Sequence, residues 1–204
     1  MALPLMAEEE EGDGEDMLFQ APVVVLVPAD VEAVMVAAEE GDADALTRAL
    51  DNLRNDVNCE GEDGDRPLHL ACLYGHLECV QILLTAGASM EVRDEDGGTP
   101  LHDACAGGYK EIVSLLLQSA TSPEQIRRLL DAHDVDGDTP LHHASRGNHA
   151  DVVQLLLDYG ASPEVLNALS QSPADLADAG SMTFHRLLES AQHQAADSAC
   201  DQAS

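Results

Sequence analysis

The sequence predicts an all-α fold built from repeated helix–turn–helix units, and two observations lead to this prediction. The first is internal repetition: DRPLHLACLYGHLECVQILLTAGAS (65–89) is matched by GTPLHDACAGGYKEIVSLLLQSA (98–120) and by GDTPLHHASRGNHADVVQLLLDYGAS (137–162). The second is composition, since aromatic residues make up 2% of the 204 residues and Trp is absent. The core must therefore be built from Leu, Val, Ala and Ile, which favours small packed helices over an aromatic-rich β-sandwich.

Recurring prolines mark the length of the repeat. Pro67 and Pro100 are 33 residues apart, Pro100 and Pro140 are 40 apart, and Pro140 and Pro173 are again 33 apart. A decayed copy, QSPADLADAG (171–180), follows the three full copies, and AVMVAAEEGDADALTRAL (33–50) precedes them without the proline. The repetition therefore extends over about residues 30–190.

Helix start and stop signals recur at the same places in each copy. Thr99 and Thr139 are expected N-caps, and the proline that follows each occupies the first helical position, where its missing N–H costs nothing. A glycine or Asn148 ends the first helix at positive φ. Apolar residues at helical spacing then predict a second helix in each full copy, over Leu77–Leu84, Glu111–Leu117 and Asp151–Leu157.

With TPLH, A-x-x-x-G and L-L-x-x-G-A-S in this order, the chain resembles the ankyrin-repeat family over about residues 30–190. The resemblance implies a solenoid of stacked helix pairs joined by projecting hairpin loops, with a concave binding face. It divides the domain into an N-terminal cap (about 30–59), repeats at about 60–92, 93–132 and 133–166, and a C-terminal cap (about 167–190). LHDACAGGY and the long second repeat are similar to small ankyrin-only proteins of green plants and algae.

Two departures from the repeat pattern stand out. Arg66 replaces the N-cap threonine of the first full repeat, so a cap is lost there, although Asp65 could partly replace it. The second repeat carries seven extra residues within TSPEQIRRLLD (121–131), whose Ser122 and Gln125 form a capping box for an additional helical turn. This insertion is either a tolerated surface loop or a partner contact that presents Arg127 and Arg128.

The two ends of the chain differ from the repeats. Residues 1–29 are acidic and carry no helical period at their start, so we expect a mostly disordered tail. The apolar stretch APVVVLVP (21–28) either covers the edge of the first repeat or acts as a linear motif. Residues 191–204 are expected to form a loose C-terminal tail.

The charge balance restricts the class of partner. The formal net charge is −30, with nine Lys and Arg residues, which argues against direct nucleic-acid binding because phosphates require clustered cations. No apolar run is long enough to span a bilayer, and the acidic start does not resemble a targeting peptide. Five cysteines without metal-type spacing indicate reduced thiols. We expect a monomer in the cytoplasm or the nucleus.

Catalytic and metal chemistry find little support. His69, His102 and His142 occupy one slot in three repeats, and the family resemblance implies that this imidazole hydrogen-bonds between neighbouring turns. His142 and His143 have no further ligand at zinc spacing, and DVDGD (134–138) lacks the first and twelfth ligands of a calcium loop. Phosphate loops and nucleophile motifs are also absent from the sequence. We therefore expect no enzyme activity, cofactor or metal.

The remaining hypothesis is a surface for another protein. In ankyrin proteins the varied positions are the hairpin tips and the exposed side of the first helix, and most residues at these positions here are acidic. The candidate partner-binding residues are Glu60, Glu62, Asp63, Asp65, Leu73, Tyr74, Arg93, Glu95, Asp96, His133, Asp136, Asp138 and Arg146. They predict a scaffold, adaptor or inhibitor that binds a basic segment of a partner. The alternative is an acidic, chaperone-like holder of basic proteins that acts mainly through its tail and net charge.

Overall fold

The computed structural model describes residues 27–61, 64–178, 181, 185 and 189, and the regular elements within them are all α-helices. Residues 1–26 and 190–204, which include most of both predicted tails and of the apolar stretch at 21–28, lie outside this description. The helices are α1 (Ala29–Glu40), α2 (Ala43–Asn52), α3 (Pro67–Leu73), α4 (Leu77–Thr85), α5 (Pro100–Ala106), α6 (Lys110–Ser119), α7 (Pro123–Leu130), α8 (Pro140–Arg146), α9 (Ala150–Asp158) and α10 (Pro173–Leu176).

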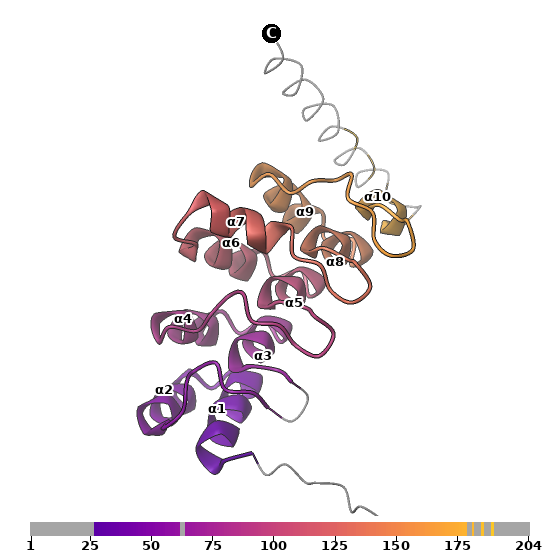
Figure 1. The fold of residues 1–204 in the computed structure, drawn as a ribbon. Helices are drawn as coiled ribbons and strands as arrows, with labels where there is room; N and C mark the ends of the chain where they lie inside the picture. The colour runs from indigo at the N-terminus through magenta and orange to yellow at the C-terminus, as the bar shows by residue number, and fades with distance from the viewer. Residues whose placement is uncertain (1–26, 62–63, 179–180, 182–184, 186–188, 190–204) are drawn as a thin grey trace, which may run out of the picture.

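The helices stack in two layers, as the repeats predict. One layer contains α1, α3, α5, α8 and α10 in order, and the second contains α2, α4, α6 and α9, with the hairpin loops projecting to one side (Figure 1). Within each layer a helix packs on the next helix of that layer, and the pairs α1 and α2, α3 and α4, α5 and α6, and α8 and α9 also pack on each other. The predicted all-α solenoid is confirmed. No helix in the described part of the chain is long and apolar enough to cross a membrane.

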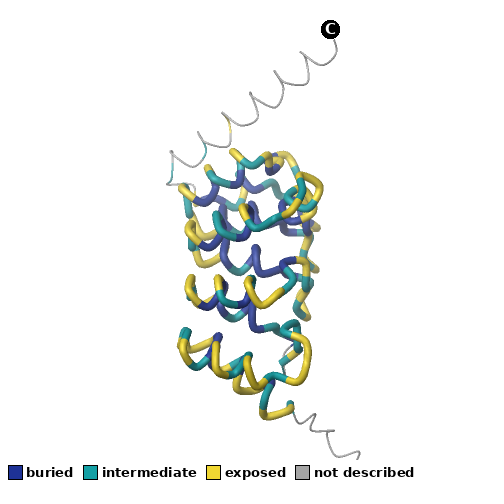
Figure 2. The backbone as a smooth tube through the Cα atoms, turned by 90° about the vertical axis from the view of Figure 1, so that its left-hand side faces the viewer, coloured by how far each residue is buried: buried dark blue, intermediate teal, exposed yellow. Residues whose placement is uncertain are grey.

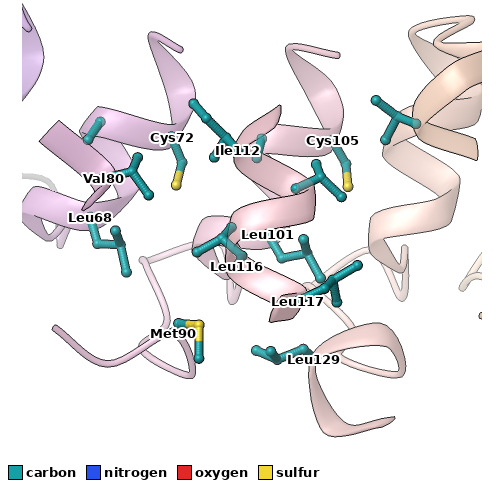
Figure 3. Packing of buried hydrophobic residues seen from close by; sticks show 14 of the residues in the cluster. Leu68, Cys72, Val80, Met90, Leu101, Cys105, Ile112, Leu116, Leu117 and Leu129 are labelled. Atoms are coloured by element: carbon teal, nitrogen blue, oxygen red, sulfur yellow. The ribbon is translucent and has the colours of Figure 1, made fainter. Parts of the chain in front are cut away.

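A single hydrophobic core runs through the stack. Leu68, Leu101 and Leu141 are the second residues of the first helices of the three full repeats, and all three are buried. Figure 2 shows the buried residues inside the stack and the exposed ones on loops and outer turns. Because one repeat cannot bury its own apolar face, this shared core is what stabilises the array. Cys72 and Cys105 are buried free thiols within it, as expected (Figure 3).

The turn between the two helices of a repeat is closed by the next repeat. Gly75 has φ 79°, and a Cβ placed on it would lie 2.4 Å from the Tyr109 ring, so this position requires glycine for both conformation and space. Asn148, at the equivalent position of the third repeat, has φ 56°, which confirms the predicted left-handed turn.

The repeated histidines fix the start of the first helices. His102 Nδ1 accepts a hydrogen bond from the Thr99 backbone N–H at 3.0 Å and lies 2.9 Å from the Thr99 hydroxyl. His102 Nε2 reaches the Asp138 carbonyl, 3.2 Å away in the next repeat. His142 repeats the arrangement with Thr139 and the Gln171 carbonyl. The role between neighbouring turns is confirmed for these two imidazoles.

The insertion forms a two-turn helix, α7, which is longer than the single turn predicted. Ser122 accepts from the Gln125 N–H at its start, and Gln125 accepts in return from the Thr121 backbone. Leu129 and Leu130 are buried in the common core, and Figure 3 shows Leu129 on the same side of the core as Leu117 and Met90. The insertion is therefore a packed part of the domain.

Candidate protein-binding surface

The tips of the hairpin loops are joined to one another by backbone hydrogen bonds. The Val135 N–H donates to the Asp96 carbonyl at 2.8 Å, and one repeat later the Ala168 N–H donates to the Asp136 carbonyl at 2.9 Å. Each tip turns at a glycine with positive φ, Gly97 and Gly137. Because equivalent backbone atoms meet in successive repeats, the tips lie in one row along the side of the solenoid. We call this row the loop ridge.

Exposed carboxylates lie along the loop ridge. Glu95 and Asp96 come from one tip and Asp136 from the next, and all three are exposed. Glu60 is also exposed but forms an ion pair with Arg66 at 3.3 Å. Asp65 is half-buried. The predicted positions Glu62 and Asp63 lie outside the described residues.

The two basic candidates of this region bind the protein's own backbone. Arg93 is exposed, yet its guanidinium donates to the carbonyls of Gly97 and His133, which ties two consecutive hairpins together. The exposed His133 has its Nδ1 3.2 Å from the Gly137 carbonyl. These residues therefore support the shape of the loop ridge as well as lying on it.

Asp138 is a correction to the predicted set, because its side chain is only 1% exposed. It accepts hydrogen bonds from the Arg146 guanidinium and, at 2.8 Å, from the Asn167 amide. Burial alone would raise the pKa of Asp138, but these two hydrogen bonds, together with the charges of Arg146 and His142, lower it. Asp138 thus holds Arg146, which remains exposed, in place and does not itself face a partner.

The predicted apolar anchor lies at the end of α3. Leu73 is 42% exposed and Tyr74 is 47% exposed, and three other large apolar side chains, Val135, Leu166 and Leu169, are more exposed still. The Tyr74 ring stacks on His76 with 6.3 Å between ring centroids. Val36 of the neighbouring α1 is 43% exposed and was missed by sequence reasoning, because the first repeat lacks the TPLH signal that aligns the others.

Comparison with known proteins decides the family. A model of ankyrin repeats in three copies matches residues 34–126, and a single ankyrin-repeat model matches residues 136–168, so that together they span more than half of the chain. The chain belongs to the ankyrin-repeat family. Ankyrin repeats are in general non-enzymatic domains that bind other proteins, and the array is therefore a protein–protein interaction module.

The relatives of this ankyrin-repeat chain are similar over short segments. Human oxysterol-binding protein-related protein 1 is 42% identical over 64 residues, which cover 27% of this chain and 7% of the relative. Probable E3 ubiquitin-protein ligase XBOS32 of Oryza sativa subsp. japonica is 47% identical over 53 residues (26% and 10%). Human scaffold protein ILK is 36% identical over 62 residues (30% and 14%). The chain thus spans a small part of each of these relatives.

The ankyrin array also carries a groove beside the insertion. Its lining residues come from α7 and from the second hairpin: Glu91, Arg93, Thr99, Glu124, Arg127, Arg128, Leu129, Asp131 and Ala132. Arg128 crosses it to form an ion pair with Glu91 at 2.8 Å, which lowers the pKa of Glu91. Acidic and basic side chains alternate here, so the groove does not share the negative charge of the loop ridge.

Proposed function

We propose that the ankyrin array binds a basic segment of another protein, without catalysis of its own, and acts as a scaffold, adaptor or inhibitor. The observation that carries the proposal is the loop ridge, on which backbone hydrogen bonds hold Asp96 and Asp136 in line. A net charge of −30 adds long-range attraction for cationic partners. The name of one relative, scaffold protein ILK, is compatible with such a role.

Leu73 and Tyr74 give the proposed partner a second feature. Exposed aromatic side chains next to charged residues are typical anchors at protein interfaces. The partner segment should therefore place an apolar residue on α3 and Lys or Arg residues opposite the loop ridge. We further propose that the protein acts as a monomer in the cytoplasm or the nucleus, on a protein partner and not directly on nucleic acid.

A peptide-binding measurement tests the proposal. Labelled peptides with Lys or Arg around a central Leu are compared, by fluorescence polarisation, with peptides of equal charge that lack the Leu. The full chain should prefer the first set, and the triple variant Glu95→Gln, Asp96→Asn, Asp136→Asn should weaken binding to both. The matched control, Asp51→Asn, Glu78→Gln, Glu111→Gln, removes three exposed charges from the second helices α2, α4 and α6.

The same measurement separates the alternative function, an acidic holder of basic proteins that acts by net charge. In that case both triple variants weaken binding equally, and the central Leu of the peptide contributes nothing. Deleting residues 1–26, which precede α1, would then remove most of the binding, whereas Tyr74→Ala would not. Equal binding of the ridge variant and the control variant therefore counts against the loop ridge.

A further inference from the structure

Three ligand-type side chains meet where the first full repeat packs on the second. His69 lies on α3, Asp94 on the following hairpin and Asp103 on α5, and one ligand atom of each lies within 4.8 Å of the other two. His69 is 1% exposed, and both carboxylates are partly buried. Asp94 directly precedes Glu95 and Asp96 of the loop ridge, but it is partly buried whereas those two residues are exposed.

Two atoms of this cluster are buried without a hydrogen-bond partner: His69 Nε2 and Asp103 Oδ2. In the next repeats the equivalent imidazoles of His102 and His142 reach a carbonyl at 3.2 Å. The Gly98 carbonyl has the corresponding place beside His69 and favours its protonated form, but does not complete a hydrogen bond. A buried polar atom without a partner costs about 1–3 kcal/mol, so two at one site point to a missing ligand.

The third repeat shows what the second lacks. Its His143 occupies the place of Asp103, and its Asp134 that of Asp94, with the same spacing of nine residues. There His143 Nε2 lies 2.8 Å from Asp134 Oδ2, so the pair satisfies itself. In the second repeat a carboxylate faces a carboxylate instead. Burial, and then the charges of Asp94 and Asp65, raise the pKa of Asp103 to about 8, which reports the cost of this arrangement.

We propose that His69, Asp94 and Asp103 form a binding site for a divalent cation of the zinc class. One imidazole nitrogen and two carboxylate oxygens are a donor set that Zn²⁺ accepts, with water in the fourth position of its tetrahedron. The cation would neutralise both carboxylates and give His69 Nε2 and Asp103 Oδ2 the partner they lack. Because the ligands come from three elements, sequence spacing could not show the site.

Arg66 stands where the next two repeats have threonine, and this difference favours metal binding by His69 over His102 and His142. Coordination through Nε2 requires the ring proton to sit on Nδ1. At His102 and His142 the backbone N–H of a threonine donates to Nδ1 at 3.0 Å, and the hydroxyl of the same threonine lies within 2.9 Å of this nitrogen. At His69 only the Arg66 backbone N–H does so, over a longer 3.3 Å. The change of tautomer therefore breaks a longer and weaker backbone hydrogen bond at His69 than at His102 and His142.

Asp94 is positioned to take part. Its Oδ1 accepts the Gly98 N–H at 2.7 Å, which fixes the carboxylate against the hairpin. A Cβ on Gly98 would lie 2.8 Å from Asp94 Oδ2, so glycine leaves this second oxygen its space. The donor atoms, at most 4.8 Å apart, must approach to about 3.4 Å around a zinc ion whose bonds are about 2.0–2.2 Å long. The side chains would have to rotate to bring the donor atoms this close.

The test uses the full chain, stripped with a chelator, and Zn²⁺ alone as the probe. Calorimetric titration should give one site well above the weak binding of surface acids, and thermal unfolding should shift upward with zinc. Asp103→Asn and Asp94→Asn should each lower the affinity at least tenfold, and both amides keep the size of the side chain. Asp134→Asn, in the self-satisfied cluster of the third repeat, is the matched control and should leave the affinity unchanged.

Co²⁺ gives a signal that reports on the metal ligands themselves and not on the stability of the fold. The parent and Asp134→Asn should show the visible absorption of tetrahedral cobalt, and Asp103→Asn should lose it while retaining the parent's circular dichroism. Equal zinc binding by all variants would mean adventitious ions on an acidic surface, and would overturn the proposal. An unfolding temperature of the parent that does not change with zinc would also overturn the proposal. In that case the Gly98 carbonyl would be the only group that His69 Nε2 faces.

Discussion

The side-chain oxygen Oδ1 of Asn148 accepts a hydrogen bond from the backbone N–H of Asp178, 3.1 Å away. Asn148 therefore does two things at once: it adopts the left-handed turn, with φ 56°, and it fastens the segment that follows α10. The equivalent Gly75 and Gly108 can do only the first. Asparagine at this position therefore links the third full repeat to the decayed copy that contains α10.

Asn148→Gly should cost up to about 1 kcal/mol, since the turn is kept but the hydrogen bond to Asp178 is lost. Asn148→Val should cost more, about 1–2 kcal/mol, because a β-branched residue also resists positive φ. Chemical denaturation of the two variants beside the parent measures the difference. Equal stability of the Gly and Val variants would contradict a strained turn at this position.

Arg66→Thr should change the free energy of unfolding by less than about 0.5 kcal/mol. Threonine restores a hydroxyl beside His69, but the arginine donates to the Asn58 carbonyl at 2.8 Å and pairs with Glu60. Arg66→Ala loses both kinds of contact and should be less stable than Arg66→Thr by about 0.5–1 kcal/mol. If Arg66→Thr is no more stable than Arg66→Ala, the threonine hydroxyl does not contribute to the free energy of unfolding in this repeat.

Stability should fall as the pH drops below about 6.5, in part through His142. The pKa of His142 lies below 6.5, mainly because the imidazole is buried and also because Arg146 and His143 are nearby. The Gln171 carbonyl and Asp138 act in the opposite direction but do not cancel this shift. The unfolded chain then takes up a proton that the folded state resists, so stability present above pH 6.5 is lost as the pH falls towards the folded-state pKa. Denaturation midpoints of the parent and His142→Gln at pH 7.5 and 5.5 test this.

The difference between the two pH values should be smaller in His142→Gln than in the parent. His133→Gln, which replaces an exposed imidazole, is the control for the loss of a histidine as such. If all three proteins lose the same stability between pH 7.5 and 5.5, carboxylates alone account for the acid sensitivity.

Leu129→Ala should destabilise the whole domain by about 2–4 kcal/mol, because a fully buried leucine leaves a cavity when truncated. Arg127→Ala, on the exposed side of the same helix, should stay within about 0.5 kcal/mol of the parent. Thermal and chemical unfolding measure both. If Leu129→Ala is as stable as the parent, α7 does not contribute to the stability of the core and is a tolerated surface loop.

Tyr74→Ala should mainly speed dissociation of a bound partner, at a cost of about 2 kcal/mol or more if the ring is buried in the complex. Neutralising Glu95, Asp96 and Asp136 together should instead slow association and flatten its salt dependence. Surface plasmon resonance at two salt concentrations distinguishes the effects. If both variants bind like the parent, the interface lies elsewhere, and the groove beside α7 becomes the next candidate.

The helices could be predicted from the sequence because each signal occurs several times, so one copy corrects another. Asp138 could not be placed, because its burial depends on Asn167 and Arg146, which approach it only after folding. The same position is Gly98 in the repeat before, so the repeats offer no warning. The cluster of His69, Asp94 and Asp103 was missed for a related reason: its members come from three separate elements, and the repeat pattern explains each of them individually.

The hydrogen bonds from Val135 to Asp96 and from Ala168 to Asp136 fix the spacing between successive tips of the loop ridge. Each repeat contributes one tip, and backbone atoms set the distance from one tip to the next. The same type of hydrogen bond joins the tips on both sides of the third repeat, although α7 is inserted before it. Substitutions at the tips can therefore alter the sign or strength of attraction, but not the interval between sites. A partner whose basic residues recur at another interval could engage only one tip at a time, so selectivity would reside in its spacing more than in its total charge.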